Sequence, residues 1–188
     1  MVCVLPHPIL VLKGESPLMK RVYLLLIVAI TVLAADGLVK FGIEQWLGVH
    51  DLVVPVVGES LRLTLVYNTG VALGMFGNGG GALLVLTGAI IVSLLIWSTY
   101  RVYETKTPAL AYLPLGLILG GASANFIDRV IDGRVTDFLD FGYRMWRFPT
   151  FNLADCALVV GVSLFMILFW DRHKSEFTEM PLTADTYR

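Results

Sequence analysis

Long apolar runs alternate with polar segments along the whole sequence. The four runs extend over residues 22–42, 82–100, 109–127 and 153–170. Each has close to the roughly 20 residues that a helix needs to cross the hydrocarbon core of a bilayer. The pattern predicts an all-α integral membrane protein with four transmembrane helices.

The segment between the first two runs has a different pattern. Residues 52–67 contain two short apolar stretches around Gly58, Glu59 and Ser60, and the second stretch alternates apolar with polar side chains. This alternation is typical of a half-buried strand. We therefore predict a small extracytoplasmic β element between the first and second helices, followed by a glycine-rich linker over residues 77–81.

The composition agrees with a membrane protein and excludes some partners. Apolar residues make up 56% of the 188 residues, charged residues 15%, and the mean hydropathy is +0.75. Soluble domains are nearer a quarter charged. The net charge of −1 argues against nucleic-acid binding, which needs a basic face. Cys3 and Cys156 fit neither a disulfide framework nor a zinc site.

The first apolar run and the basic residues indicate how the chain is oriented. The run follows Lys20 and Arg21 but ends without a small-x-small cleavage site, so we expect an uncleaved helix. With the N-terminus inside, eight Lys and Arg residues lie on the cytoplasmic side and six on the other, which favours cytoplasmic termini. We expect residues 1–21 to be a cytoplasmic extension, 22–170 the four-helix membrane domain and 171–188 a cytoplasmic tail.

Unusual polar residues lie at the ends of the predicted helices. Because successive helices run in opposite directions, all these positions fall on one face of the membrane, which is the outer face in this orientation. Polar groups in such apolar surroundings are costly and usually functional. The cluster comprises Asp36, Lys40, Asn68, Thr69, Asn125, Asp128, Arg129, Asn152 and Asp155.

Five segments resemble, in order, the motifs of the bacterial lipoprotein signal peptidases, also called type II signal peptidases. These segments are residues 36–40, 67–75, 120–129, 135–138 and 148–155. The resemblance covers roughly residues 22–170. Gly37, Leu73 and Ala124 stand where the family usually has Gln, Phe and Gly. None of these positions is a carboxylate, so the departures concern local packing.

The resemblance implies a membrane aspartic endopeptidase with Asp137 and Asp155 as catalytic residues. Hydrolysis without a covalent intermediate requires a base for the attacking water and an acid for the scissile group. Two aspartates that share one proton supply both. Asp155 lies one turn into the fourth apolar run, and Asp137 lies in the preceding loop. The residues expected to bind substrate or support the site are Asp36, Lys40, Asn68, Gly121, Asn125, Asp128, Arg129, Asn152 and Ala154.

These residues also have purely structural interpretations. Asp137 taken alone fits a solvated loop, and Asp155 fits an acid that interacts with a helix N-terminus. The asparagines fit helix caps or interhelical hydrogen bonds. We expect Asp128 to form an ion pair with Arg129. We expect Asp140 to be solvated, so that Asp140→Asn retains most activity.

Other classes of protein explain the sequence less well. A serine–lysine peptidase with Lys40 as base lacks a supporting motif around Ser60 or Ser123, and a metallopeptidase lacks a His-Glu-x-x-His motif. A small transporter would carry ionisable residues near the bilayer midplane. A non-catalytic membrane subunit would need no polar cluster. The last two remain the alternatives to a peptidase.

The resemblance also implies a substrate and a location. The substrates are prolipoproteins that already carry a diacylglyceryl group on a cysteine, and cleavage falls just before that cysteine. The lipid anchor would hold the scissile bond at the membrane surface, beside the carboxylates. We expect a monomeric, multi-pass protein of the bacterial inner membrane that contacts membrane lipids. We expect an active site at the extracytoplasmic face that needs no metal or other cofactor.

Overall fold

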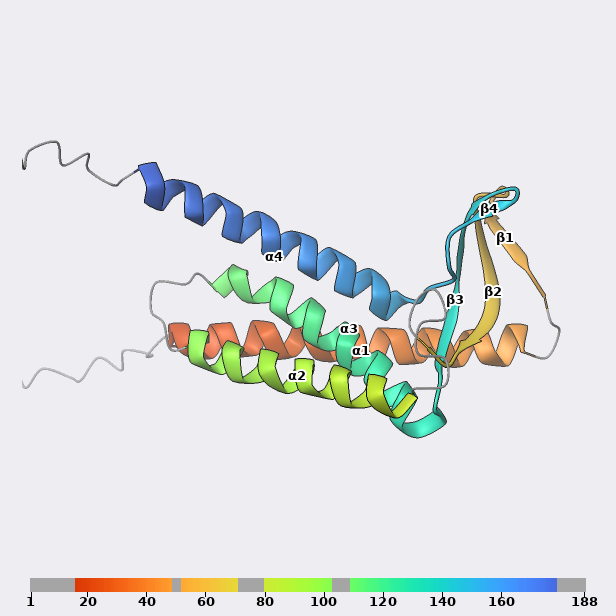
Figure 1. Cartoon of the computed structure of the whole chain (residues 1–188), viewed down its shortest axis with the longest axis horizontal. Helices are drawn as coiled ribbons and strands as arrows, with labels where there is room; N and C mark the ends of the chain where they lie inside the picture. The colour runs from red at the N-terminus through yellow and green to blue at the C-terminus, as the bar shows by residue number, and fades with distance from the viewer. Residues whose placement is uncertain (1–15, 49–51, 71–79, 103–108, 179–188) are drawn as a thin grey trace, which may run out of the picture.

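The computed structural model describes residues 16–48, 52–70, 80–102 and 109–178, and shows long helices with a small sheet at one end (Figure 1). The helices are α1 (Pro17–Leu47), α2 (Gly80–Val102), α3 (Tyr112–Asp132), which follows the short 3-10 helix η2 (Ala109–Ala111), and α4 (Leu153–Thr178). The strands are β1 (Val54–Val57), β2 (Leu61–Asn68), β3 (Val135–Tyr143) and β4 (Trp146–Arg147). Of the predicted glycine-rich linker, residues 77–79 lie outside the described residues, and Gly80 and Gly81 are not linker but the first residues of α2.

Three helical segments are long and apolar enough to cross a membrane: Pro17–Leu47, Gly81–Arg101 and Ala109–Asp132. In α4, the apolar part among the described residues is the shorter stretch Leu153–Leu168. A mostly helical protein with several membrane-capable helices is therefore confirmed. The fourth span stays a prediction.

Helix α3 is the central element of the bundle. It packs against each of the other three helices, and 56% of its apolar window is buried inside the protein, against 11% for α1 and α2. Gly116 and Gly120 allow α3 to approach α1 closely, because a Cβ at these positions would crowd Val28 and Ala29. By contrast, α1 and α2 turn many large apolar side chains outward, as a surface in contact with hydrocarbon does.

The four strands form one antiparallel sheet in the order β1-β2-β3-β4. The two strands predicted around the turn at residues 58–60 are present as β1 and β2. The expectation of a loop around Asp137 is wrong, because residues 135–147 supply β3 and β4, and β3 pairs with β2. Asp137, Asp140 and Gly142 interrupt the apolar pattern of β3, so its sequence does not resemble a regular strand.

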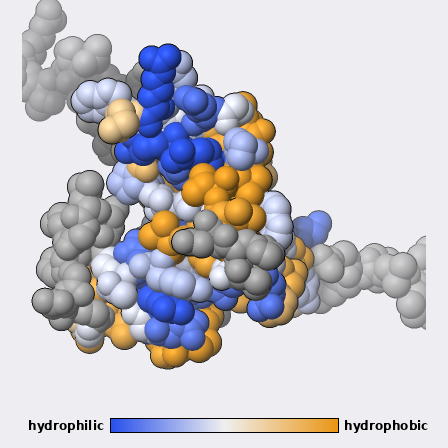
Figure 2. Space-filling view, turned by 90° about the vertical axis from the view of Figure 1, so that its right-hand side faces the viewer, coloured by the Kyte–Doolittle hydropathy of each residue, from blue (hydrophilic) through white to orange (hydrophobic). Residues whose placement is uncertain are grey.

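Two contacts join the sheet to the helices. Gly133 ends α3 in the left-handed conformation, with a φ of 69°, and its N–H donates to the carbonyl of Arg129, so that the chain turns directly into β3. Phe138 of β3 packs against Ile43 and Leu47 near the C-terminal end of α1. Seen from the sheet end, the molecule shows hydrophilic and hydrophobic surfaces next to one another (Figure 2). The sheet therefore stands against the helix ends that carry the predicted polar cluster.

Candidate active site

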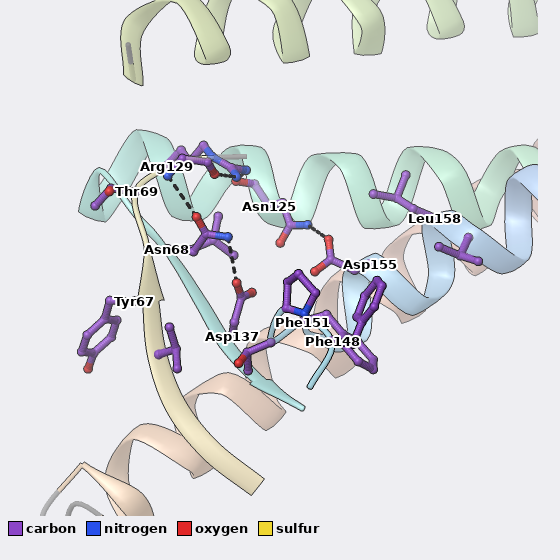
Figure 3. A pocket seen from close by; sticks show the side chains of 16 residues that line it. Tyr67, Asn68, Thr69, Asn125, Arg129, Asp137, Phe148, Phe151, Asp155 and Leu158 are labelled. Carbon is purple, nitrogen blue, oxygen red and sulfur yellow. Dashed lines mark hydrogen bonds between the residues drawn. The ribbon is translucent and has the colours of Figure 1, made fainter. Parts of the chain in front are cut away.

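A cavity of about 580 Å³ lies where the sheet meets the helices. It is lined by the end of β2, by α3, by the start of β3, by residues 148–151 and by the first turns of α4 (Figure 3). The lining includes the two predicted catalytic residues and three predicted supporting residues: Asp137, Asp155, Asn68, Asn125 and Arg129. Side chains from four separate elements thus meet at one cavity.

Asp137 is a buried strand residue, only 2% exposed, and not a solvated loop residue. Its Oδ2 accepts a hydrogen bond from Asn68 Nδ2 (2.9 Å), and its Oδ1 accepts one from Asn152 Nδ2 (2.7 Å). Burial raises the pKa of Asp137 to about 6; the amide donors oppose this shift and the charge of Asp155 adds to it. This carboxyl group therefore holds a proton more readily than an ordinary aspartate does.

Asp155 is held in place by the way that α4 begins. Asn152 Oδ1 accepts from the N–H of Asp155 (2.9 Å), and Asp155 Oδ2 accepts in return from the N–H of Asn152 (3.2 Å). This reciprocal arrangement is a capping box. Asp155 Oδ1 accepts a further hydrogen bond from Asn125 Nδ2 (2.8 Å). The same contacts cap the helix and orient the carboxylate, so the structural and functional interpretations of Asn152 and Asp155 are compatible.

The side chains of Asn125 and Asn152 link the two aspartates. Asn152 is completely buried and donates through Nδ2 both to Asp137 and to Asn125 Oδ1 (3.1 Å). Asn125 donates through its own Nδ2 to Asp155. Because these partners fix the donor and acceptor ends of both amides, each carboxylate faces N–H groups in a defined orientation. The two aspartates belong to one hydrogen-bonded network.

A group of ion pairs, buried except at Asp128, continues this network. Lys40 Nζ lies 2.5 Å from Asp36 Oδ2 and 2.6 Å from Asp128 Oδ2, and it donates to Asn125 Oδ1 (3.2 Å). Asp36 Oδ1 also accepts from the backbone N–H of Ala154 (2.9 Å). We name Lys40, Asp36 and Asp128 the Lys40 cluster. It joins α1, α3 and α4 at the helix ends beside the cavity.

The predicted ion pair between Asp128 and Arg129 is wrong: within the described residues, Asp128 pairs with Lys40. Arg129 instead donates through Nη1 to the carbonyl of Asn125 (3.1 Å) and through Nη2 to the carbonyl of Gly70 (3.0 Å). Consecutive residues of a helix point in different directions, so neighbours in sequence are poorly placed to pair. Arg129 Nε is buried without a hydrogen-bond partner in the described part of the chain.

Asp140 is not solvated, contrary to the prediction. It is 7% exposed and accepts hydrogen bonds from Arg62 Nε (2.9 Å) and Arg147 Nε (2.6 Å). Burial alone would raise the pKa of Asp140, but the hydrogen bonds and charges of Arg147 and Arg62 bring it below its ordinary value. Sequence reasoning missed these partners because they face one another only across the strands that flank β3.

Gly121 and Ala154 allow α3 and α4 to approach closely beside the site. Ala154 is fully buried, and a Cβ at Gly121 would overlap its carbonyl oxygen and crowd Leu158. Gly121 lies one turn before Asn125, so the close approach brings Asn125 within hydrogen-bonding distance of Asp155. The small size of Gly121 is therefore required by the geometry of the site.

The described residues do not contain the serine–lysine site of the alternative peptidase mechanism. Lys40 is engaged with two carboxylates and does not line the cavity. Ser60 belongs to the turn between β1 and β2, and Ser123 is not among the cavity residues. A serine–lysine pair is therefore not assembled here.

Proteins named lipoprotein signal peptidase are similar in sequence to most of this chain. The lipoprotein signal peptidase of Moorella thermoacetica is 41% identical over 77% of this chain and 89% of its own length. That of Halothermothrix orenii is 36% identical over 79% of this chain and 96% of its own. That of Serratia marcescens is 38% identical over 77% and 83%, respectively.

Solved structures and a family model agree with these relatives. Two bacterial membrane enzymes determined by the in meso method share the fold. One has a TM-score of 0.68 at 24% identity over 87% of this chain and 94% of its own. The other has a TM-score of 0.64 at 27% identity over 77% and 91%. Residues 28–171 match the family model described as signal peptidase (SPase) II. The chain therefore belongs to the signal peptidase II family and is a protease.

Proposed function

We propose that this protease is an aspartic endopeptidase that removes the signal peptide from diacylglyceryl-modified prolipoproteins by cleavage just before the modified cysteine. Asp137 and Asp155 are its catalytic pair. The observation that carries the proposal is that both carboxylates line one cavity and accept hydrogen bonds from asparagine side chains. The names of the relatives support the substrate class. The matches do not favour a transporter or a non-catalytic subunit.

The two carboxylates have different roles in this reaction. We assign the shared proton to Asp137, whose pKa is raised by burial, and the role of base to Asp155. As water attacks the scissile carbonyl, Asp155 accepts a proton from the water and Asp137 donates one to the carbonyl oxygen. The intermediate then collapses: Asp155 protonates the leaving nitrogen, Asp137 regains a proton from a hydroxyl group, and the C–N bond breaks. The pair returns to its starting state.

The remaining lining of the cavity supplies places for the peptide. Arg129 and Asn68, whose side chains carry hydrogen-bond donors, both line the cavity. A substrate carbonyl offers an acceptor for such a donor. Residues 148–151 and Leu158 contribute apolar surface to the same cavity. We assign the polar groups to the substrate backbone and the apolar surface to its side chains.

The proposed orientation has four spans, both termini in the cytoplasm and the cavity at the extracytoplasmic face. It is supported by the basic-residue counts and by the position of the cavity at the sheet end of the bundle. A lipid anchor in the outer leaflet would then hold the cysteine near the two aspartates. We propose that the protein acts as a monomer. A reporter fused after Arg172 should report cytoplasm, and one within residues 135–147 should report the outer side.

The decisive experiment is cleavage of a synthetic prolipoprotein peptide by the purified protein in detergent micelles. The wild type should cleave the diacylglyceryl-modified peptide before its cysteine and leave the unmodified peptide intact. Asp137→Asn and Asp155→Asn should each reduce the rate by about a thousandfold or more, since general acid–base groups are removed. Asp132→Asn, at an exposed position at the end of α3, is the matched control. Normal cleavage by either active-site variant would disprove the catalytic assignment.

A further inference from the structure

A group of charged side chains outside the cavity connects β2, β3 and β4 of the sheet. Asp140 of β3 accepts hydrogen bonds from Arg62 of β2 and from Arg147 of β4. Arg147 also donates through Nη2 to the carbonyl of Asp140 (2.9 Å) and through Nη1 to the carbonyl of Glu59 (2.8 Å) in the β1–β2 turn. We name Asp140, Arg62 and Arg147 the Asp140 cluster. In this cluster, two cationic side chains pair with one carboxylate.

Arg147 is the last residue of β4, and the residues that follow it line the cavity. We name residues 148–151 the cavity wall, because all four belong to the lining. Figure 3 shows Phe148 and Phe151 near the two aspartates. The wall therefore joins the Asp140 cluster at one end to the start of α4 at the other.

The cavity wall is held to β3 by backbone hydrogen bonds, which include one from the N–H of Phe138 to the carbonyl of Phe151 (3.0 Å). The N–H of Phe148 donates to the carbonyl of Phe141 (2.8 Å), and Phe151 exchanges hydrogen bonds with Leu139 (3.1 and 2.8 Å). Phe148 is 62% exposed, so core packing does not fix its place. The position of the wall depends on these strand contacts and on Arg147, which precedes it.

We propose that Asp140 is a positioning residue for the protease: through Arg147, it holds the cavity wall where the wall binds substrate. The proposal rests on the function proposed above, which assigns the cavity to the prolipoprotein. Arg62 bonds the other side of Asp140 and belongs to β2, which does not continue into the wall. Arg62 therefore stabilises the sheet, whereas Arg147 transmits the constraint from Asp140 to the wall.

Steady-state kinetics separates positioning from a general loss of structure. Asp140→Asn and Arg147→Met should each raise KM about tenfold, the value of one lost hydrogen bond to a charged group, and should change kcat less than about threefold. The double variant should raise KM no further than either single variant, because both changes break the same link. Arg62→Met should change KM less than either. Asp140→Glu, which keeps a carboxylate, should have a lower KM than Asp140→Asn.

Glu59→Gln is the matched control. It removes one negative charge from the same sheet at an exposed side chain and leaves the carbonyl that Arg147 uses. It should leave both KM and kcat unchanged. A rise in KM as large as that of Asp140→Asn would mean that sheet charge alone sets substrate affinity, which would overturn the proposal.

Hydrogen exchange gives a readout that needs no substrate. In Asp140→Asn and Arg147→Met, the amides of Phe148 and Phe151 should exchange at least about tenfold faster, while those of α3 keep their protection. Unchanged exchange and unchanged KM in a folded Arg147→Met protein would overturn the proposal, even if Asp140→Asn does not fold. If the wild type fails to cleave the lipid-modified peptide, the proposed function fails. Exchange then still decides whether Asp140 holds the wall.

Discussion

The Lys40 cluster and the Asp140 cluster have opposite charge patterns in different surroundings. In the first, one ammonium group meets two carboxylates between helices; in the second, one carboxylate meets two guanidinium groups across strands. Lys40 and Asp36 have side chains that are 6% and 1% exposed, whereas that of Arg62 is 35% exposed. Water can therefore reach part of the sheet cluster but almost none of the Lys40–Asp36 pair.

This difference in access to water decides what the loss of one partner costs. An ion left unpaired in a dry site cannot be hydrated, so its full desolvation penalty remains. An ion left at a partly exposed site is hydrated instead, and the cost is smaller. The Lys40 cluster should therefore be essential to the fold beside the cavity. The Asp140 cluster should instead adjust a part of the cavity.

The largest effect is expected when the helix cluster is broken. Lys40→Met leaves Asp36 buried without its cation and should lower the free energy of unfolding by about 3–5 kcal/mol. Thermal or denaturant unfolding in micelles measures this. The double variant Asp36→Asn/Lys40→Met should be more stable than Lys40→Met alone. A loss of less than about 1 kcal/mol would show that the two clusters do not differ in the way described.

A second effect compares two aspartates that lie three residues apart on β3. The pKa of Asp137 is raised to about 6, so between about pH 4 and pH 6 the folded protein binds more protons at this site than the unfolded chain. Its effect is to lower the free energy of unfolding by about 3 kcal/mol as the pH rises through that window. The pKa of Asp140 is lowered. The stabilisation that ionised Asp140 provides is therefore present above the ordinary pKa of an aspartate and is lost only as the pH falls below that value.

Unfolding curves between pH 4 and pH 8 test this contrast. Relative to the wild type, Asp137→Asn should remove the fall in stability between about pH 4 and pH 6. Asp140→Asn should leave the slope in that window almost unchanged and shift the whole curve downward. Identical pH profiles for the two variants would mean that their surroundings do not set their proton affinities.

A smaller effect is expected from breaking the sheet cluster. Asp140→Asn should lower the free energy of unfolding by about 1–3 kcal/mol, because both guanidinium groups lose a charged acceptor but keep some access to water. Arg62→Met should cost less than about 1 kcal/mol. Unfolding in micelles ranks the two variants against Lys40→Met. If Asp140→Asn cost more than Lys40→Met, exposure would not be the deciding factor.

No effect is expected from a chelator. The two-aspartate mechanism requires no metal, so a strong chelator should leave cleavage of the lipid-modified peptide unchanged, with or without added zinc. The control is a zinc peptidase inactivated under the same conditions. Loss of activity that zinc restores would disprove the mechanism.

The helices and the meeting of polar residues at one end of the bundle were predictable from local properties, whereas Asp137 was singled out by the family resemblance. Apolar length predicts the helices, and alternating helix direction brings Asp36, Asn125 and Asp155 to one end of the bundle. The partners were not predictable. Asp128 lies beside Arg129 in sequence, yet its ion-pair partner is Lys40, 88 residues away. Only the packing of α1 on α3 decides between them.

The sheet shows the same limit. Strands β1 and β2 could be predicted from alternation and a turn, which are properties of one short segment. Strand β3 carries two buried aspartates that its own sequence does not explain. Asp137 is accommodated by Asn68 and Asn152, and Asp140 by the arginines of β2 and β4. The two buried aspartates of β3 are therefore explained only by partners in the neighbouring strands and at the start of α4.

The central position of α3 has a consequence for the biogenesis of the protein. It is the least apolar of the three membrane-capable helices and the most buried, and it carries Asn125, Asp128 and Arg129. Charged residues in a span oppose its transfer from the insertion machinery into lipid. Helix α1 is synthesised earlier and brings Lys40, the cation that pairs with Asp128. We therefore expect α3 to leave the insertion machinery alongside α1, so that part of the hydrogen-bonded support for Asp155 forms during membrane insertion itself.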